Sequence, residues 1–529
     1  MKRIPTIAVV GALALAVAGC GDDSGSPPAG SDALVDGATF TLVLGADPGN
    51  LDPHFTSQGT ALQIGRFLYD SLVNIDETGE TVAGLAETWE GTTTTATYTL
   101  RDNITCSDGT PLTASMVAEN ISFVGDPENA SSRIGVFVPA GATATGDDAA
   151  GTVTVTSPAP DPFLDRNVGG LPIVCEKGME NRDLLTQGAD GTGMFTVTEA
   201  VADDHYTLTR RKDYAWGPGD WNTDERGLPD TAVIRIVGNE TTTANLLLAN
   251  EVNAALVVGP EKQRLEAQQL FQRDAVAPLG ELWFNQEAGM PGVDEAVRRA
   301  LTQALDLGEL GQVVASGAGQ PATGLVGPGG PCNQDTVGSN LPTTDVEAAR
   351  SALDAAGWTA GPDGIRTKDG QPLSLEVYVP TSVGPGLPAG AELIQQRWRD
   401  VGVEATIRSV SDAEVGQLII GGEGSWGATI LPLTVSMPTQ LVPFLSGPTP
   451  PDGVNFASIN NAEYAENVQA ASAIAGAGGC DQWAAAEVAL FQHVDIVPFV
   501  NSTAPFFGQG ATFELSQSSL TPSSIRMLA

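Results

Sequence analysis

The most distinctive part of the chain is residues 98–114, which read Tyr98-Thr99-Leu100-Arg101-Asp102-Asn103-Ile104-Thr105-Cys106-Ser107-Asp108-Gly109-Thr110-Pro111-Leu112-Thr113-Ala114. Residues 96–100 alternate in polarity, and this pattern predicts a β-strand that runs into the stretch. Asp108-Gly109 predicts a tight turn, because glycine reaches positive φ at no steric cost. The stretch therefore predicts the end of a strand, followed by a compact turn beside a cysteine.

Strand patterns continue on both sides of this stretch, from residue 39 to about residue 260. Short runs either alternate in polarity or stay apolar, and Gly, Asp and Pro separate them. Further examples are 39–44, 151–155 and 233–237. The first half of the chain is therefore predicted to be rich in β-structure.

The second half alternates between helical and strand patterns. Apolar residues recur at helical spacing over 294–310, which predicts one amphipathic helix. Asp345 is a candidate N-cap for the next helix, and Gly357 is its stop signal. A strand at 373–379, a helix at 391–401 and a strand at 403–410 follow. This alternation predicts an α/β lobe with a sheet of its own.

The N-terminus predicts export. A positive start is followed by an apolar stretch up to Val17, too short to be a secure membrane span, and then by Ala18-Gly19-Cys20. The cysteine matches the lipobox of bacterial lipoproteins, so residues 1–19 are interpreted as a signal peptide and Cys20 as the lipidated residue. The alternative is an ordinary secretory signal with an incidental cysteine. Residues 20–38 are interpreted as a flexible tether.

Chain length and net charge limit the possible architectures and functions. The chain has 529 residues, more than one compact core usually holds, which favours two lobes. Its 64 acidic residues against 25 basic ones give a formal net charge of −39. Nucleic acid and anionic lipid surfaces would be repelled by such a charge, which disfavours functions that need a basic patch.

Four further cysteines predict disulfides. An even number in an exported chain indicates two bridges, and three pairings are possible from sequence alone. A zinc site is not expected, because no CxxC occurs and the chain has only three histidines. The four are Cys106, Cys175, Cys332 and Cys480.

Sequence motifs of enzymes are missing. The chain has no G-x-S-x-G elbow, no phosphate-binding loop and no H-E-x-x-H motif. One G-x-G-x-x-G occurs at Gly422–Gly427, but no helical pattern follows it, so it is interpreted as a turn. We therefore predict no catalytic residues, no metal and no cofactor.

Short phrases along almost the whole mature chain occur in a fixed order. They lie at 47–53, 68–73, 84–89, 98–114, 191–195, 211–216, 250–253, 283–285, 297–301, 304–306, 355–358, 363–373 and 494–499. In this ordered set the chain resembles the extracytoplasmic solute-binding proteins of family 5, the dipeptide, oligopeptide and nickel class. Most of these residues are interpreted as scaffold.

The resemblance implies an α/β fold: a two-lobed periplasmic-binding-protein-like clamp of type II, dipeptide-binding-protein-like, with a discontinuous first lobe. Lobe I would comprise residues 39–282 and 498–529, and lobe II residues 283–497. Bridges inside the lobes permit hinge motion, whereas bridges between them would lock it. The resemblance therefore predicts the pairs Cys106–Cys175 and Cys332–Cys480.

The resemblance also implies candidate ligand-binding residues. Peptide-binding relatives carry Trp-x-Ala-Asp at the cleft, where the aspartate pairs with the ligand's ammonium group. The matching stretch here is Trp426-Gly427-Ala428-Thr429, with threonine at the aspartate position. Trp426 could stack on a ligand or pack between the lobes. Phe284, Asn285 and Tyr69 are further candidates for the cleft wall.

The predicted function is a receptor, not an enzyme. It would be a monomer, lipid-anchored at the extracytoplasmic face of the cell membrane, that passes a solute to the permease and ATPase subunits of an ABC importer. Peptide is the default solute of the family. Thr429 at the aspartate position weakens that expectation, and a glycan or a metal chelate stays open as the solute. The alternative is a lipoprotein of the same fold that regulates envelope synthesis and transports nothing.

Overall fold

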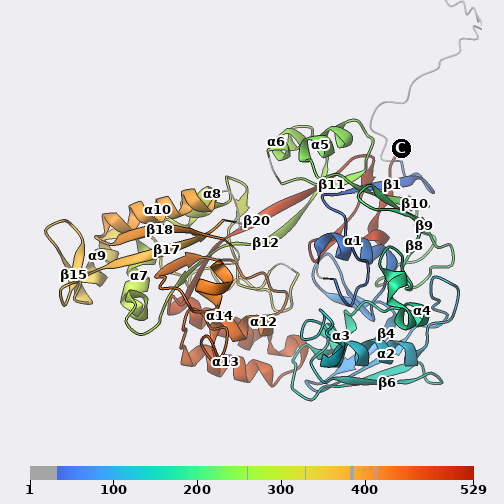
Figure 1. Ribbon diagram of the computed structural model, residues 1–529, viewed down its shortest axis with the longest axis horizontal. Coiled ribbons are helices and arrows are strands. Elements are labelled where there is room, and N and C mark those ends of the chain that lie inside the picture. The colour runs from blue at the N-terminus through green and yellow to red at the C-terminus, as the bar shows by residue number, and fades with distance from the viewer. Residues whose placement is uncertain (1–32, 57, 259, 328, 382–385, 412–413) are drawn as a thin grey trace, which may run out of the picture.

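The computed structural model describes residues 33–529 except positions 57, 259, 328, 382–385 and 412–413. The predicted signal peptide, Cys20 and most of the predicted tether lie outside the described residues. Figure 1 shows two masses joined by the long strands β12 (Phe271–Phe284) and β20 (Ile496–Gly508).

The mass that holds the N-terminal residues is rich in strands, as predicted. Thr113 caps α2 by accepting a hydrogen bond from the main-chain N–H of Met116. The elements are β1 (Thr39–Leu44), α1 (Gly59–Leu68), β2 (Val73–Ile75), β3 (Thr81–Ala83), β4 (Ala86–Gly91), β5 (Thr95–Leu100), α2 (Ala114–Gly125), β6 (Thr143–Asp147), β7 (Thr152–Thr156), α3 (Leu164–Gly169), α4 (Glu176–Glu180), β8 (Phe195–Val201), β9 (His205–Arg210), β10 (Thr231–Ile236), α5 (Glu240–Leu248), β11 (Ala254–Leu256) and α6 (Glu261–Glu266).

The other mass alternates helices and strands. Its elements are α7 (Glu295–Gln303), α8 (Leu307–Val314), β13 (Gly319–Gln320), α9 (Val346–Ala355), β14 (Thr359–Ala360), β15 (Arg366–Lys368), β16 (Gln371–Pro372), β17 (Ser374–Pro380), α10 (Leu387–Asp400), β18 (Glu404–Val410), β19 (Ala428–Ile430), α12 (Pro438–Leu445), α13 (Ala462–Ser472) and α14 (Cys480–Gln492). After β20, short strands β21 (Ala511–Thr512), β22 (Leu515–Ser516), β23 (Ser519–Leu520) and β24 (Arg526–Met527) return to the first mass.

Capping decides where two predicted helices begin. Asp345 caps α9 by accepting from the main-chain N–H of Ala348, which confirms the predicted N-cap. The prediction of one helix over 294–310 is wrong. Asp306 accepts from the main-chain N–H of Glu309 and starts α8 there, so the segment forms two helices, because aspartate favours a cap over a helix interior.

The expectation that lobe II has a sheet of its own is wrong. One 11-stranded sheet runs in the order β18-β17-β19-β12-β20-β11-β1-β10-β9-β8, and β13 also pairs with β20. The reason is the length of β12 and β20, which pair antiparallel from Phe271 opposite Gly508 to Trp283 opposite Ile496. Their two ends extend into both masses, so one ladder of hydrogen bonds joins strands from both.

The β12–β20 ladder is irregular near its middle. Its register shifts between Pro278 and Gly280 and again between Gly280 and Glu281. A Cβ atom at Gly280 would lie 2.4 Å from Cε2 of Phe499, so this close approach requires glycine.

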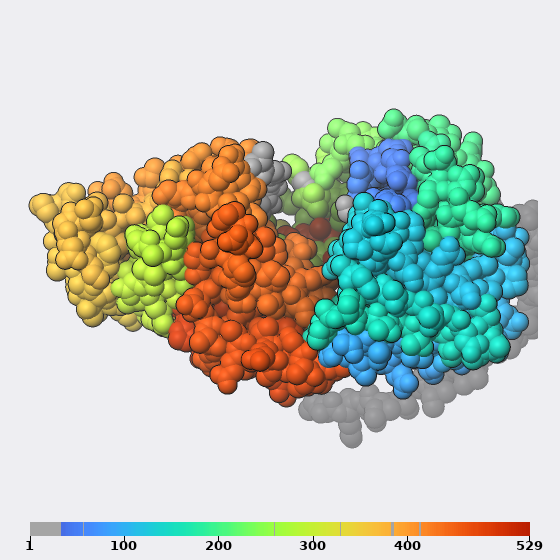
Figure 2. All heavy atoms as spheres, turned by 60° about the horizontal axis from the view of Figure 1, so that its bottom comes forward, coloured from blue at the N-terminus to red at the C-terminus, as the bar shows by residue number. Residues whose placement is uncertain are grey.

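The buried apolar side chains form two large clusters. Core I draws on residues 40–254 and 506–527, and core II on residues 282–500. A small cluster of Phe163, Met437, Ala471 and Trp483 connects the two ranges, and the rings of Phe163 and Trp483 lie 6.4 Å apart. Figure 2 shows the contact where the teal segment of one mass meets the orange-red segment of the other.

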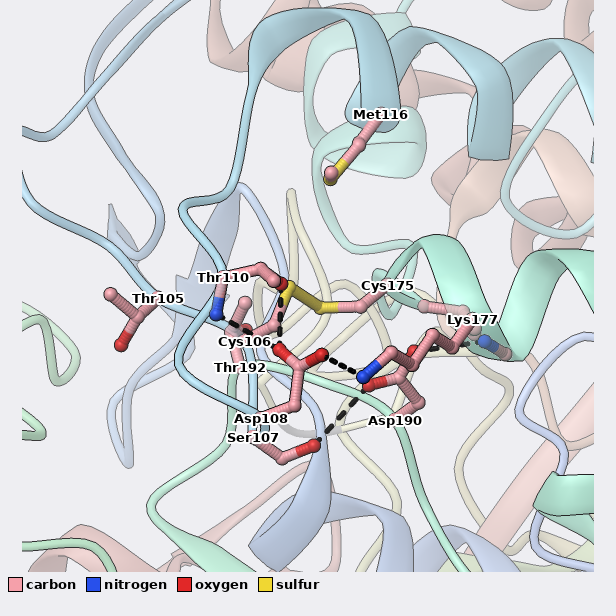
Figure 3. The surroundings of a disulfide bond; sticks show 12 residues. Thr105, Cys106, Ser107, Asp108, Thr110, Met116, Cys175, Lys177, Asp190 and Thr192 are labelled. Atoms are coloured by element: carbon pink, nitrogen blue, oxygen red, sulfur yellow. Dashed lines mark hydrogen bonds and ion pairs between the residues drawn. A yellow bond between two sulfur atoms is a disulfide. The ribbon is translucent and has the colours of Figure 1, made fainter.

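Both predicted disulfide pairs are confirmed. Cys106 bonds to Cys175 within the range of core I, and Cys332 bonds to Cys480 within the range of core II. Figure 3 shows the first bridge beside the predicted Asp108-Gly109 turn. The Asp108 carboxylate pairs with the Lys177 ammonium at 2.5 Å, and this pair links the turn to the segment that carries Cys175.

Candidate functional site

A cavity of about 370 Å³ lies where core I meets the segment before α12. Most of its lining comes from the range of core I, and Ser436 and Met437 come from the range of core II. It is bounded by residues of α1, the segment 136–137, α3 and the hairpin β22–β23. Solute sites typically lie at such junctions between domains.

Helix α1 supplies one wall of this cavity. The helix ends at Leu68; the C-cap residue Tyr69 has an extended backbone, and its main-chain N–H donates to the Gly65 carbonyl. The next residue, Asp70, is held by three donors: the hydroxyls of Thr192 and Tyr214 at 3.1 and 3.0 Å and the Trp216 indole N–H at 3.1 Å. Burial raises the pKa of Asp70, and these bonds counteract the rise. The wall is therefore firmly held.

Two arginines also line the cavity. Burial lowers the pKa of Arg66 to about 10. Arg166 on α3 joins the two core ranges, because it donates to the carbonyl of Gly79 at 3.2 Å and to the carbonyl of Gly329 at 3.0 Å. Within the described part of the chain neither guanidinium has a carboxylate within ion-pair distance. Sequence reasoning missed both; a single cation among the apolar residues of α1 was the available signal for Arg66.

A buried polar cluster around His54 lies next to the cavity, because His54 bonds to the lining residue Pro172. His54 Nε2 donates to the Pro172 carbonyl, and its Nδ1 accepts from Arg182 at 2.7 Å. Burial lowers the pKa of His54 to about 3, so the ring is neutral at physiological pH. The Arg182 guanidinium lies over the rings of Phe55 and Phe123, at 5.3 and 4.6 Å from their centroids. This histidine is therefore a structural residue.

The predicted ligand-binding residues fall into two places. Tyr69 lines the cavity; its side chain is buried, and its hydroxyl has no hydrogen-bond partner among the described residues. Trp426, Thr429, Phe284 and Asn285 lie together in core II, outside the cavity lining, and are at most 2% exposed.

Contacts hold this second group in place. Asn285 Nδ2 donates to the Trp426 carbonyl at 3.0 Å, and the indole of Trp426 packs on Phe456. The Thr429 hydroxyl donates to the Tyr378 carbonyl at 2.9 Å. A direct contact of these four side chains with a solute stays a prediction.

A second hollow, of about 690 Å³, lies within the range of core II. Its ionisable side chains are three carboxylates (Glu295, Glu463 and Asp495), Arg298 and His493, and they contact one another. Arg298 pairs with Asp495 at 2.9 Å, and His493 Nδ1 lies 2.8 Å from the Glu295 carboxylate. Since these side chains already contact one another, the hollow offers a solute fewer free polar groups than the cavity between the cores.

The chain belongs to the bacterial extracellular solute-binding proteins, family 5, because the model of that family (its Middle part) matches residues 80–464. Protein XP55 of Streptomyces lividans is 29% identical over 303 residues, which are 54% of this chain and 51% of XP55. The chain thus spans about half the length of that relative. The nickel-binding periplasmic protein of Escherichia coli (strain K12) is 26% identical over 399 residues, 71% of this chain and 72% of that protein.

The fold is also found in a solved structure. The ABC transporter substrate binding protein CtaP of Listeria monocytogenes superposes with a TM-score of 0.77 at 18% identity, covering 94% of this chain and 100% of that one. The chain is therefore a solute-binding protein of family 5, and it has the fold of an ABC transporter substrate binding protein. None of the helices among the described residues is long and apolar enough to cross a membrane.

Proposed function

We propose that the chain is the lipid-anchored receptor of an ABC importer, which encloses a solute in the 370 Å³ cavity and delivers it to permease and ATPase subunits. The observation that carries this proposal is the composition of the cavity wall. Tyr69 comes from the range of core I, and Met437 comes from that of core II. A cavity with walls from two cores opens and closes when the cores move apart and together.

The proposed lobes are residues 39–282 with 498–529, and residues 283–497. Two features support these boundaries. Core II draws on residues 282–500 and core I on residues outside that range. The register shifts of β12 around Gly280 lie next to the proposed crossing, where an interrupted ladder bends more easily than a regular one.

Occupancy of the cavity can be tested with a pair of matched leucines. Leu62 lines the cavity and is 37% exposed, whereas Leu248 on α5 lies outside the cavity lining and is 39% exposed. Leu62→Trp adds bulk at the cavity, and Leu248→Trp adds the same bulk elsewhere. We expect Leu62→Trp alone to remove the solute that co-purifies with the protein, detected by native mass spectrometry. Equal solute content in both variants would refute the cavity as the site.

Peptide is the default solute class in this family, and the nickel-binding relative shows that other solutes occur. Thr429 stands where peptide-binding relatives carry the aspartate, and its hydroxyl is already bonded to a main-chain carbonyl. We therefore expect peptides with free and with acetylated N-termini to raise the melting temperature equally. A response to free peptides alone would show that another group anchors the ammonium.

Lipid anchoring is proposed at Cys20. Mass spectrometry of the mature N-terminus should find a diacylglyceryl cysteine, and Cys20→Ser should release the protein from the membrane fraction. If no peptide, glycan or chelate ever shifts the melting temperature and no solute co-purifies, the envelope-regulatory alternative gains support.

A further inference from the structure

The balance of charge in the proposed solute cavity is opposite to that of the whole chain. The chain has 64 acidic residues against 25 basic ones. Among the described residues that line the cavity, the basic ones are Arg66 and Arg166, and the acidic one is Asp70. The cavity is therefore a local concentration of positive charge in a strongly acidic protein.

The single carboxylate of the cavity does not neutralise these arginines. Asp70 already accepts hydrogen bonds from Thr192, Tyr214 and Trp216. It forms no ion pair with Arg66 or Arg166 among the described residues. The carboxylate oxygens of Asp70 thus accept hydrogen bonds from residues in the range of core I and do not pair with the arginines that line the cavity.

Arg66 has few hydrogen-bond partners among the described residues. Its one hydrogen bond among the described residues runs from Nη2 to Gln517 Oε1 and is 3.4 Å long, which is long for an N–H···O bond. Burial lowers the pKa of Arg66, and no carboxylate counteracts that effect. The residue is half-buried, and a guanidinium pairs well with an anion that reaches it. Arg66 thus has donors available on the cavity side of α1.

Arg166 adds a second charge of a different kind. Its donors hold the Gly79 and Gly329 carbonyls, and its buried Nε has no partner among the described residues. It therefore contributes a contact between the cores, and its charge is partly balanced by the carboxylates of Glu80 and Asp165. Arg66, in contrast, uses one donor on Gln517, and its other donors have no hydrogen-bond partner among the described residues.

The rest of the lining suits an amphipathic molecule. Phe137 and Met437 present apolar surface, while Gln517 and Ser519 of the β22–β23 hairpin present amide and hydroxyl groups. The hydrogen bond of Arg66 to Gln517 places the guanidinium beside this polar hairpin. One side of the cavity is thus cationic and polar, and other parts of its wall are apolar.

We propose that the solute is an organic anion, whose carboxylate or phosphate group pairs with Arg66 beside the β22–β23 hairpin and whose apolar body contacts Phe137 and Met437. This inference rests on the proposed function, since it concerns the same cavity. A guanidinium binds either group through two parallel hydrogen bonds, which gives such a site both affinity and orientation.

The test compares molecules that share an apolar body and differ in whether they carry an anionic group. Hippurate and its neutral amide share one body, and so do phenyl phosphate and phenol. Binding of each to the purified protein is measured by calorimetry, along with the identity of any co-purified solute. We expect one charged member to bind roughly 10- to 100-fold more tightly than its neutral partner, because a charge-assisted pair contributes that much. A difference within the hippurate pair indicates a carboxylate ligand, and a difference within the phenyl phosphate pair indicates a phosphate ligand.

Variants assign the effect to the guanidinium. Arg66→Gln should abolish the preference for the charged member, and Arg66→Lys should retain part of it. Arg399→Gln is the matched control, because Arg399 is exposed on α10, outside the cavity lining, and forms no ion pair with the described residues. Raising the salt concentration should weaken binding of the charged member to the wild type and leave the neutral member unaffected.

The outcomes separate the two proposals. Equal binding of charged and neutral members, or a preference that survives in Arg66→Gln, overturns the anion assignment. The cavity proposal stands in that case if Leu62→Trp still blocks binding. Binding that Leu62→Trp leaves unchanged overturns the cavity as the site, and the anion assignment falls with it.

Discussion

Glu281 should make the stability of this protein fall as the pH rises. The residue lies on β12, is 2% exposed, and accepts the main-chain N–H of Leu433 at 2.8 Å through its carboxyl group. Burial raises the pKa of Glu281 from 4.5 to about 8, and the carboxylate of Glu487 adds to the rise. Leu433 precedes the segment of Ser436 and Met437, so the ionisation of Glu281 bears on the cavity wall as well as on folding.

The magnitude follows from linkage. A group whose pKa is higher in the folded chain stabilises the fold fully below its unfolded pKa of 4.5. That contribution is lost as the pH rises towards 8. At about 1.4 kcal/mol per pH unit the whole change is about 5 kcal/mol. Glu487, whose pKa burial raises to about 7, adds a smaller loss of the same sign.

The assay is denaturant unfolding between pH 5 and pH 9. Glu281→Gln keeps an acceptor for the Leu433 N–H and removes the titration, so its free energy of unfolding should fall less steeply with pH than that of the wild type. Glu287→Gln is the control, because Glu287 is exposed. If Glu281→Gln and the wild type lose stability in parallel across this range, the carboxyl group of Glu281 is not protonated in the folded protein and the reasoning fails.

Three further predictions concern folding. Replacing Cys332 and Cys480 by serine removes a cross-link over 148 positions and should lower the free energy of unfolding by about 5 kcal/mol. A wild-type protein whose urea unfolding does not change with dithiothreitol would contradict this. Asp495→Ala leaves the buried Arg298 without its partner and should cost about 3–5 kcal/mol in the same assay, and a loss below about 1 kcal/mol would show that water replaces the pair. Thr429→Asp puts a carboxylate at a fully buried position of β19, so it should lower the melting temperature by several degrees and not improve the binding of peptides; tighter binding with unchanged melting would place this residue at the solute.

Local patterns in the sequence predicted much of this fold. Period-two runs and turn residues placed strands such as β1 and β5, and an aspartate before an apolar run placed the start of α9, because these signals act over a few residues. The break between α7 and α8 was missed because Leu305, directly before Asp306, continues the helical spacing of apolar residues. The ordered family phrases predicted the clamp and, through it, both disulfide pairs.

The tertiary structure alone decided where the cavity lies and which side chains reach it. Arg66 and Gln517 are 451 positions apart and meet only because the chain returns to core I after β20. The single sheet likewise depends on the pairing of β12 with β20, and the burial of Thr429 on the pairing of β19 with β12 and β17. Sequence period indicates which residues share a face of a strand, but only the pairing of distant strands decides whether that face meets a core or a solute.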